Sequence, residues 1–282
     1  MRIIFAVLAV ITLILVALVL LVRIASRKLI YQTTTLAPAE VERIGARAGW
    51  KLVRLEPVPS LTLTGLVRAP PRDDAPWILF FGGNASNIDG NRAALELVAE
   101  SSTSAVGLAV FAYRGYDGSG GSPSQKMLTE DARAVAQHLL VRHGVKPARL
   151  VLLGQSLGSG VAANLAARLS REGTPPRALV LMSPYQSMAR VFDDHVPILP
   201  IGWAVRDRYD TEAILATIQS PISIVHGSSD RLIAISHSHT LAKTGGTNVR
   251  LTELEGVGHN ELWSDTRTID VIRAALVVSP SP

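Results

Sequence analysis

The most informative residues of this chain form the pentapeptide Gly154-Gln155-Ser156-Leu157-Gly158. An apolar run of β type precedes it at residues 150–153, and a small-residue run typical of a helix follows at residues 161–167. In a strand–turn–helix context, a G-x-S-x-G sequence presents its serine as a nucleophile, and its glycines let strand and helix pack closely. The alternative is a chance turn, since the chain contains 22 glycines.

A serine hydroxyl is a poor nucleophile at neutral pH, so it needs an adjacent base that a carboxylate orients. Two later β-type runs, at residues 222–225 and 249–254, lead into Asp230 and His259 respectively. Both side chains therefore follow strand ends, and the carboxyl edge of an open α/β sheet is where such folds keep their sites. The order Ser156, Asp230, His259 predicts a nucleophile, an acid and a base.

The other histidines and acids fit this arrangement less well. His138 and His143 precede the serine, and His226 is expected to have a structural role at a strand end. His237 and His239 lie on a predicted helix, where residues two apart do not share a face, so a solvated helix start is favoured over a metal pair. His195 lies in an insertion from which it can approach substrate, whereas the alternative acids Asp207 and Asp210 are expected to cap or anchor that insertion.

Two backbone N–H groups are expected to stabilise an oxyanion beside Ser156. One belongs to Leu157, the residue after the nucleophile, and the other to Gly83 or Asn84, in the loop after the apolar run at residues 77–81. The alternative interpretation of that loop, compatible with the first, is a strand-to-helix turn with an Asn helix cap.

These positions require alternating strands and helices. We expect a hairpin at residues 52–55 and 61–67, further strands at 77–81, 109–112, 150–153, 178–182, 222–225 and 249–254, and helices that include 92–100 and 261–276. Such alternation predicts an α/β fold with a mainly parallel sheet that helices cover on both faces. The pattern breaks between residues 184 and 220, where residues 196–203 are apolar and interrupted by prolines. This insertion is either ordinary packing over the core or a cap that shapes an acyl pocket or touches a bilayer.

Several blocks in the correct order make the chain resemble the α/β-hydrolase superfamily. They are Phe81-Gly82-Gly83-Asn84-Ala85, Tyr113-Arg114-Gly115-Tyr116, Gly154 to Gly158, Ser183-Pro184-Tyr185, Arg208-Tyr209-Asp210, Pro221 to Asp230, and Gly258-His259-Asn260. More narrowly, the chain is similar to small membrane-anchored serine hydrolases that include protein depalmitoylases and lysophospholipid lipases. The resemblance covers roughly residues 50–275. It implies an α/β-hydrolase fold with Ser156 as nucleophile, Asp230 as acid, His259 as base, and Asn84 and Leu157 as oxyanion-hole amides.

The N-terminus predicts a membrane anchor. Residues 3–22 carry no charge and only one polar side chain, Thr12, and as a helix they would span about 30 Å, the thickness of a bilayer's hydrocarbon core. A cleaved signal peptide is the alternative, but the run is longer than a signal's apolar region, and Arg23, Arg27 and Lys28 occupy the zone of a cleavage site. Orientation stays open, because these basic residues and the very short tail point to opposite sides of the membrane.

Composition narrows the function classes. The net charge of +5 suits an anionic membrane surface, and no basic run interleaved with aromatics indicates nucleic-acid binding. The chain has no cysteine, which excludes disulfides, a cysteine nucleophile and thiolate metal sites. No feature calls for a metal or another cofactor.

We therefore expect an anchor at residues 1–23, a linker with a short helix at 24–50, and a catalytic domain at 51–282 with a small cap at about 184–220. The predicted function is a membrane-anchored, single-pass serine hydrolase that cleaves an ester or thioester of a small or lipid-like acyl substrate. An aminopeptidase or acyltransferase with the same machinery, or a non-catalytic tethered binding module, is the alternative.

Overall fold

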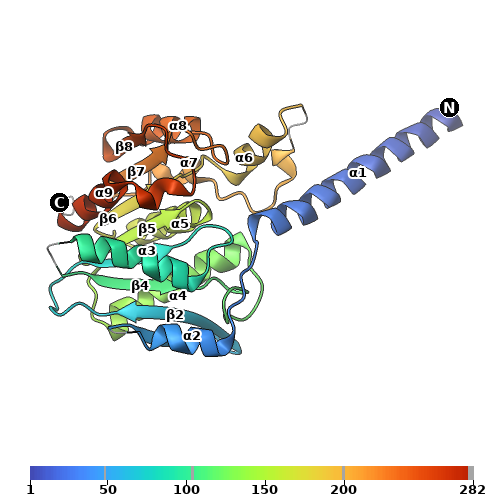
Figure 1. The fold of residues 1–282 in the computed structure, drawn as a ribbon. Coiled ribbons are helices and arrows are strands. Elements are labelled where there is room, and N and C mark those ends of the chain that lie inside the picture. The colour runs from blue at the N-terminus through green and yellow to red at the C-terminus, as the bar shows by residue number, and fades with distance from the viewer. Residues whose placement is uncertain (48, 103–104, 199–200, 279–282) are drawn as a thin grey trace.

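The computed structural model describes residues 1–47, 49–102, 105–198 and 201–278. Its strands form one eight-stranded sheet in the order β1-β2-β4-β3-β5-β6-β7-β8 (Figure 1). The strands are β1 (Lys51–Val58), β2 (Leu61–Arg68), β3 (Trp77–Phe81), β4 (Gly107–Phe111), β5 (Leu150–Gln155), β6 (Ala178–Met182), β7 (Ile222–Gly227) and β8 (Val249–Leu254). The fold class that the sequence predicts is confirmed.

The sheet is parallel from β4 to β8 in its spatial order and antiparallel at its other end. β1 pairs with β2 and β2 with β4 in antiparallel fashion, which places the predicted hairpin at the edge. The five pairings from β4–β3 to β7–β8 are all parallel. Because parallel strands share a direction, the loops that follow β3, β4, β5, β6, β7 and β8 all emerge at one edge, which we call the catalytic edge.

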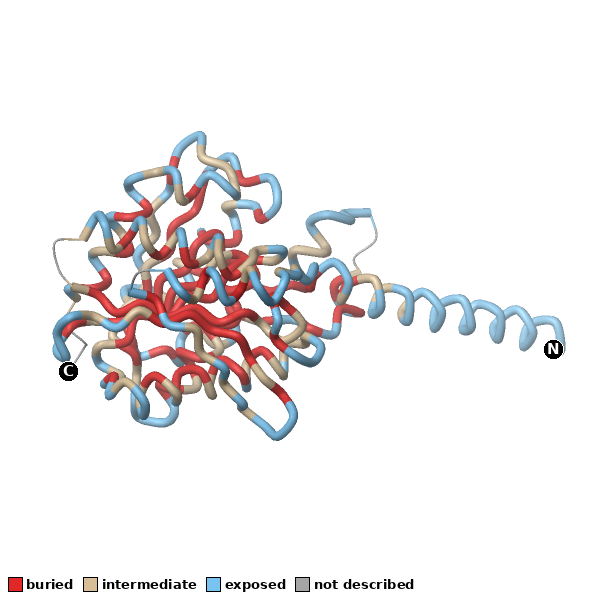
Figure 2. The backbone as a smooth tube through the Cα atoms, turned by 60° about the horizontal axis from the view of Figure 1, so that its bottom comes forward, coloured by how far each residue is buried: buried red, intermediate tan, exposed pale blue. Residues whose placement is uncertain are grey.

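Helices cover both faces of the sheet, so the central strands are buried on both sides and are apolar throughout. One buried cluster contains side chains of α4 (Gln125–Arg142), α5 (Leu157–Arg171) and α8 (Ser236–Gly245). The cluster on the other face contains side chains of α2 (Pro38–Gly45), α3 (Ile88–Ser101) and α9 (Thr266–Val277). Figure 2 shows the buried backbone concentrated in the sheet between these layers.

The remaining elements lie around the catalytic edge or join strands. They are α6 (Met188–His195), η2 (Gly202–Ala204), α7 (Thr211–Leu215), and the short 3-10 helices η1 (Pro147–Arg149), η3 (Gly246–Asn248) and η4 (Glu261–Ser264). The predicted final helix at 261–276 is instead η4 followed by α9, because the Asp265 carboxylate accepts a hydrogen bond from Arg267 N–H and so begins a new helix there. In the predicted cap, residues 199 and 200 lie outside the described residues.

The N-terminal helix α1 (Arg2–Ile30) projects from the domain, and most of its length is exposed (Figures 1 and 2). Within the described ranges it is the one helix long and apolar enough to cross a membrane, with a mean hydropathy of 3.4 over an 18-residue window that has no buried residue. The helix continues beyond residue 23, where we expected a linker, and its last turns bury Ser26 and Ile30 in the domain.

Candidate active site

Ser156 sits in a strained turn between β5 and α5. Its φ of 50° and ψ of −119° lie in a region that non-glycine residues rarely adopt and that surrounding contacts must hold. Its N–H donates to the Met182 carbonyl of β6 at 2.9 Å, and the Ser159 hydroxyl donates to the Ser156 carbonyl at 2.6 Å. The backbone on both sides of the serine is therefore fixed by hydrogen bonds to neighbouring elements.

The two glycines of the motif are required by close packing rather than by their torsion angles. A Cβ on Gly154 would overlap the Gly158 carbonyl, and one on Gly158 would overlap the Phe81 carbonyl at the end of β3. The first turn of α5 is thereby packed directly against β5 and β3. In that turn the Ser159 N–H already donates to the Ser156 carbonyl at 2.9 Å. The first N–H of a helix, here that of Leu157, has no carbonyl partner within the helix, and the positive end of the helix dipole adds to its field.

The loop after β3, at residues 82–87, lies beside the serine. A Cβ on Gly83 would stand 3.5 Å from the Ser156 Cβ, so this backbone runs alongside the turn. Tyr113 donates its hydroxyl proton to the Gly82 carbonyl at 2.8 Å, and Ser86 donates to the Gly83 carbonyl at 2.7 Å. The Gly82 and Gly83 carbonyl groups therefore hold this loop in place.

Asparagines in this loop have two different roles. Asn87 caps α3 by accepting a hydrogen bond from Gly90 N–H at 2.8 Å. The Asn84 side chain does not cap a helix, because its Oδ1 accepts from Gln32 N–H at 2.7 Å and its Nδ2 donates to the Leu29 carbonyl at 2.8 Å. A helix-capping asparagine, Asn87, is therefore present in the loop beside Ser156. The Asn84 side chain instead binds the last turn of α1 and the residues that follow it.

The acid and the base are in direct contact. Asp230 follows β7, His259 follows β8, and His259 Nδ1 lies 2.7 Å from Asp230 Oδ2. Asp230 is buried and His259 is half-buried. Since a carboxylate can only accept, the imidazole proton is on Nδ1, and Nε2 is left as the basic nitrogen.

The Asp230 carboxylate accepts hydrogen bonds on both oxygens. Oδ1 accepts from the N–H groups of Leu232 and Ile233 at 2.9 and 2.8 Å, and Oδ2 accepts from the Ser183 hydroxyl at 2.7 Å. Burial by itself would raise the pKa of this carboxyl, but hydrogen bonds from His226, His259 and Ile233 N–H outweigh it and hold the pKa well below its usual range. Asp230 is thus a permanent anion at physiological pH.

His226 has the structural role that its position at the end of β7 predicts. The ring is fully buried, and its Nε2 faces two acceptors, the Ile233 carbonyl at 2.8 Å and Asp230 Oδ2 at 3.2 Å. The proton is therefore on Nε2, and Nδ1 contacts the Ser238 hydroxyl at 2.6 Å. This ring fixes the loop that carries Asp230.

The prediction for His237 is wrong in one respect. His239 is exposed and pairs with Glu253, as a solvated helix start requires, but His237 is buried, with Nε2 2.9 Å from the Asp194 carboxylate. The sequence pattern misses this because the partner, Asp194, lies on α6 in the insertion, far from His237 in the sequence. In the part of the chain that the structure describes, no group of three or more His, Asp or Glu side chains is placed to hold a metal ion.

The alternative acids lie away from the Asp230–His259 pair. Asp207 is buried 3.6 Å from the Arg27 guanidinium at the foot of α1, and Asp210 immediately precedes α7. Asp207 therefore connects the insertion to α1, in agreement with its expected anchoring role.

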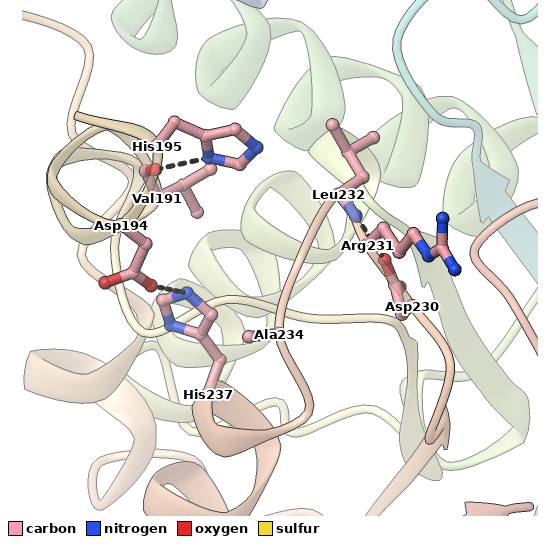
Figure 3. A pocket seen from close by; sticks show the side chains of 8 residues that line it. All are labelled: Val191, Asp194, His195, Asp230, Arg231, Leu232, Ala234 and His237. Atoms are coloured by element: carbon pink, nitrogen blue, oxygen red, sulfur yellow. Dashed lines mark hydrogen bonds and ion pairs between the residues drawn. The ribbon is translucent and has the colours of Figure 1, made fainter. Parts of the chain in front are cut away.

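A cavity of about 370 Å³ adjoins the acid between α6 and the loop after β7. His195 and Leu232 face it from opposite sides, and the ion pair of Asp194 and His237 lies at its base (Figure 3). Asp230 lines this cavity, whereas Ser156 and His259 do not. His195 thus borders a space next to the acid, and its Nδ1 lies 2.8 Å from the Val191 carbonyl.

The structure joins two of the three predicted catalytic side chains and places the third at the same edge. The hydrogen bonds of the described residues connect Asp230 to His259 but do not extend to the Ser156 hydroxyl, so the contact between serine and imidazole stays a prediction. One hydrogen bond nevertheless links their segments, because Trp263 Nε1 donates to Gln155 Oε1 at 2.8 Å. Gln155 directly precedes the serine, and Trp263 lies in η4, which begins two residues after His259.

Residue-by-residue reasoning did not assign roles to Ser183, Gln155 and Trp263. Ser183 could have been found, because it directly follows β6 at the catalytic edge and precedes a proline. The Gln155–Trp263 pair gives no comparable signal, since its members are 108 residues apart and neither occupies a characteristic spacing.

Comparison with known proteins shows the family. The family model described as "alpha/beta hydrolase fold" matches residues 124–199. An uncharacterized protein of Mycobacterium tuberculosis is 36% identical over 205 residues, which cover 71% of this chain and 69% of that protein. The chain belongs to the α/β-hydrolase superfamily. This confirms the family resemblance and identifies the chain as an α/β-fold hydrolase of the serine-hydrolase type.

Two further relatives extend the comparison. The lysophosphatidylserine lipase ABHD12 of Danio rerio is 34% identical over 171 residues, which cover 56% of this α/β hydrolase and 44% of that protein. A solved α/β hydrolase from Vibrio vulnificus superposes with a TM-score of 0.68 at 20% identity, covering 86% of this chain and 96% of that one. The solved structure shows the likeness of fold.

Proposed function

We propose that this α/β hydrolase is a membrane-anchored enzyme that cleaves carboxylic esters or thioesters of lipid-like acyl groups through Ser156, His259 and Asp230. The observation that carries the proposal is the 2.7 Å hydrogen bond between His259 and Asp230 at the edge where a strained turn presents Ser156. A buried carboxylate with a depressed pKa fixes the imidazole tautomer whose free nitrogen is a base.

In the proposed reaction, Ser156 Oγ attacks the acyl carbonyl carbon while His259 Nε2 takes the hydroxyl proton. The oxyanion that forms is stabilised by the N–H groups of Leu157 and of Gly83 or Asn84. The imidazolium, which Asp230 stabilises, then gives its proton to the departing alcohol or thiol, and the acyl group stays on the serine. A water molecule attacks this acyl-enzyme with His259 again as base, releasing the carboxylic acid and regenerating Ser156.

The membrane part of the proposal rests on α1. Its exposed apolar length matches a bilayer's hydrocarbon core, and an enzyme held there has acyl lipids as its most concentrated potential substrates. A relative of this chain is a lysophosphatidylserine lipase, which supports an acyl lipid as the substrate class. Ester and thioester carbonyls are treated alike by such a site, because the same acyl-enzyme forms from both.

The test uses the full chain in lipid vesicles with a series of acyl esters, acyl thioesters and aminoacyl amides. We expect turnover of esters or thioesters that Ser156→Ala reduces at least 10⁴-fold, since loss of the nucleophile removes the covalent route (an estimate of about this size follows from other serine hydrolases). Ser170→Ala is the control, because its hydroxyl is on the same helix but contacts Gln219 N–H at 3.1 Å. Undiminished turnover by Ser156→Ala, or turnover of amides only, would contradict the proposal.

A further inference from the structure

The C-terminal end of α1 is fixed to the domain rather than flexibly linked. Ser26 and Ile30 are buried, and Arg27 donates to the Pro123 carbonyl at 2.6 Å while its guanidinium lies 3.6 Å from Asp207. One residue beyond the helix, the Tyr31 hydroxyl contacts the buried Tyr209 hydroxyl at 3.1 Å. We call residues 26–34 the strap.

The strap binds loops of the catalytic edge. Asn84 holds the strap from the loop after β3 through the Leu29 carbonyl and Gln32 N–H. Asp117, in the loop after β4, donates its N–H to the Thr34 carbonyl at 3.0 Å, and Tyr209 belongs to the insertion after β6. Because all three loops follow carboxyl ends of strands, α1 leaves the domain from the same edge that carries Ser156 and His259.

The distance between that edge and a bilayer follows from the helix itself. The uncharged run ends at residue 22, and the first buried residue of α1 is Ser26. Four residues of α-helix rise about 6 Å, so the catalytic edge begins within roughly one helical turn of the hydrocarbon boundary. Surfaces beside the foot of α1 would lie at the depth of the lipid headgroups.

Exposed apolar side chains of the insertion and of the loop after β7 form one set near this place. We call it the cap face, and its members are Val196, Ile198, Trp203 and Leu232. Ile198 is 97% exposed and Trp203 68% exposed, and η2, which carries Trp203, packs against α1. Figure 1 shows α6 beside the foot of α1, on the side from which α1 projects.

The chemistry of the cap face fits a lipid interface. Tryptophan favours the boundary between headgroups and acyl chains, where its ring is apolar and its N–H stays hydrated. Exposed Arg206 and Arg208 follow Trp203, and Arg23 and Lys28 lie on the adjoining turns of α1, so basic groups flank the apolar patch. For a surface with this combination of apolar and basic side chains, contact with an anionic bilayer is more favourable than exposure to water.

We propose that the cap face rests in the interfacial layer of the bilayer that holds α1, so that the catalytic edge opens toward the membrane. This inference rests on the proposed anchor and adds the orientation of the site. Leu232 belongs both to the cap face and to the wall of the cavity beside Asp230, so the membrane-facing surface is continuous with that cavity (Figure 3). An acyl chain would then approach the site from the bilayer rather than from the aqueous side.

Tryptophan fluorescence tests this with the full chain. Of the four tryptophans, Trp50 and Trp77 are buried, Trp263 is half-buried and bonded to Gln155, and Trp203 is exposed. In vesicles whose phospholipid acyl chains carry bromine, which quenches nearby indoles, we expect lower emission than in unbrominated vesicles of the same headgroup composition. Trp203→Phe should abolish this difference, and Trp203 emission should shift to shorter wavelength on vesicle insertion.

A relocated tryptophan is the matched control. Val141 is also highly exposed, but it lies near the end of α4, next to His143, whose ring contacts Trp77 at the start of β3. That is the opposite edge of the sheet. The double variant Trp203→Phe, Val141→Trp should therefore show no quenching by brominated lipid.

The outcomes separate this inference from the proposed function. Equal quenching of the wild type and Trp203→Phe, or quenching of the relocated tryptophan, would overturn the orientation, and a cap face that stays unquenched would be free for a protein partner instead. Failure of the full chain to float with vesicles would overturn both the anchor and the cap-face contact. Ester hydrolysis by the same samples reports on the catalytic proposal alone.

Discussion

Replacing Asp230 with asparagine changes one oxygen of the site into an amide group. The remaining carbonyl oxygen can still accept from the N–H groups of Leu232 and Ile233, as Oδ1 does now. The new NH₂ group would face the Ser183 hydroxyl, His226 Nε2 and His259 Nδ1, all of which donate to Oδ2 in the wild type. Asp230→Asn therefore places the new NH₂ donor opposite three existing hydrogen-bond donors, while the size of the side chain stays the same.

The effect on catalysis follows from the imidazole tautomer. To avoid a clash with the amide, His259 must accept at Nδ1, which moves its proton to Nε2 and removes the base that would face Ser156. The equivalent change in a serine protease lowers kcat about 10⁴-fold, and we expect a loss of this order in kcat/KM here.

The effect on stability is smaller. The Ser183 hydroxyl can rotate to accept from the amide, but the His226 proton keeps only the Ile233 carbonyl as partner. Its bond to the charged Asp230 carboxylate is lost, and a hydrogen bond to a charged acceptor is worth about 1.5–3 kcal/mol. For a domain of this size, about 2–4 °C of Tm corresponds to each kcal/mol, so Tm should fall by roughly 3–10 °C.

The assay is ester turnover by the full chain together with thermal unfolding of the same preparation. Asp207→Asn is the control, since Asp207 is also buried and ion-paired but contacts Arg27 rather than a histidine. We expect kcat/KM of the control to stay within a few-fold of the wild type. A folded Asp230→Asn enzyme with activity near that of the wild type would refute the assigned role of the acid.

Three further predictions follow from the same contacts. Ser183→Ala removes a hydrogen bond to a charged acceptor and should lower kcat/KM about tenfold and Tm by a few degrees, measured by ester turnover and thermal unfolding; a variant equal to the wild type in both would contradict this role. Trp263→Phe should lower kcat several-fold because it breaks the bond to Gln155, whereas Trp50→Phe, which breaks an equally long 2.8 Å bond to a carboxylate elsewhere, should cost about 1 kcal/mol of stability and leave kcat unchanged. The pKa of Asp230 is depressed in the folded state, so the stability gained from its ionised form should be complete above the unfolded pKa of about 4 and should be lost as the pH falls below it. Tm measured against pH should show the gap between wild type and Asp230→Asn narrowing in that acidic range, and a gap that stays constant there would show that Asp230 does not titrate as inferred.

Local pattern was enough to predict the elements that position the site. The strand at Trp77–Phe81 and the strand at Ala178–Met182 begin and end where the apolar runs do, because both are buried on both faces and their flanks are polar, proline or glycine. The strand–turn–helix at Ser156 could be predicted for a related reason, since its glycines are demanded by backbone contacts on either side. The pairing of Asp230 with His259 was expected from their places after neighbouring strands.

Contacts between segments far apart in the sequence could not be predicted in this way. Buried His237 is paired with Asp194, which lies on α6 in the insertion. The pattern of residues along the helix that carries His237 cannot predict a partner from another segment. The sequence likewise contains no sign that the Asn84 side chain binds the strap, 52 and 55 residues earlier in the chain. The apolar run at residues 3–22 also did not predict where α1 ends. The helix continues past this run and is stabilised there by burial of Ser26 and Ile30.

The most direct test of the central claim is to identify the residue that becomes covalently modified. The full chain is treated with a fluorophosphonate, which reacts with activated serines, and the adduct is assigned by mass spectrometry of peptides. We expect a single adduct on Ser156, absent from His259→Ala and Asp230→Asn under the same brief exposure. An adduct on another serine, or labelling that persists in Ser156→Ala, would contradict the assignment of Ser156 as nucleophile.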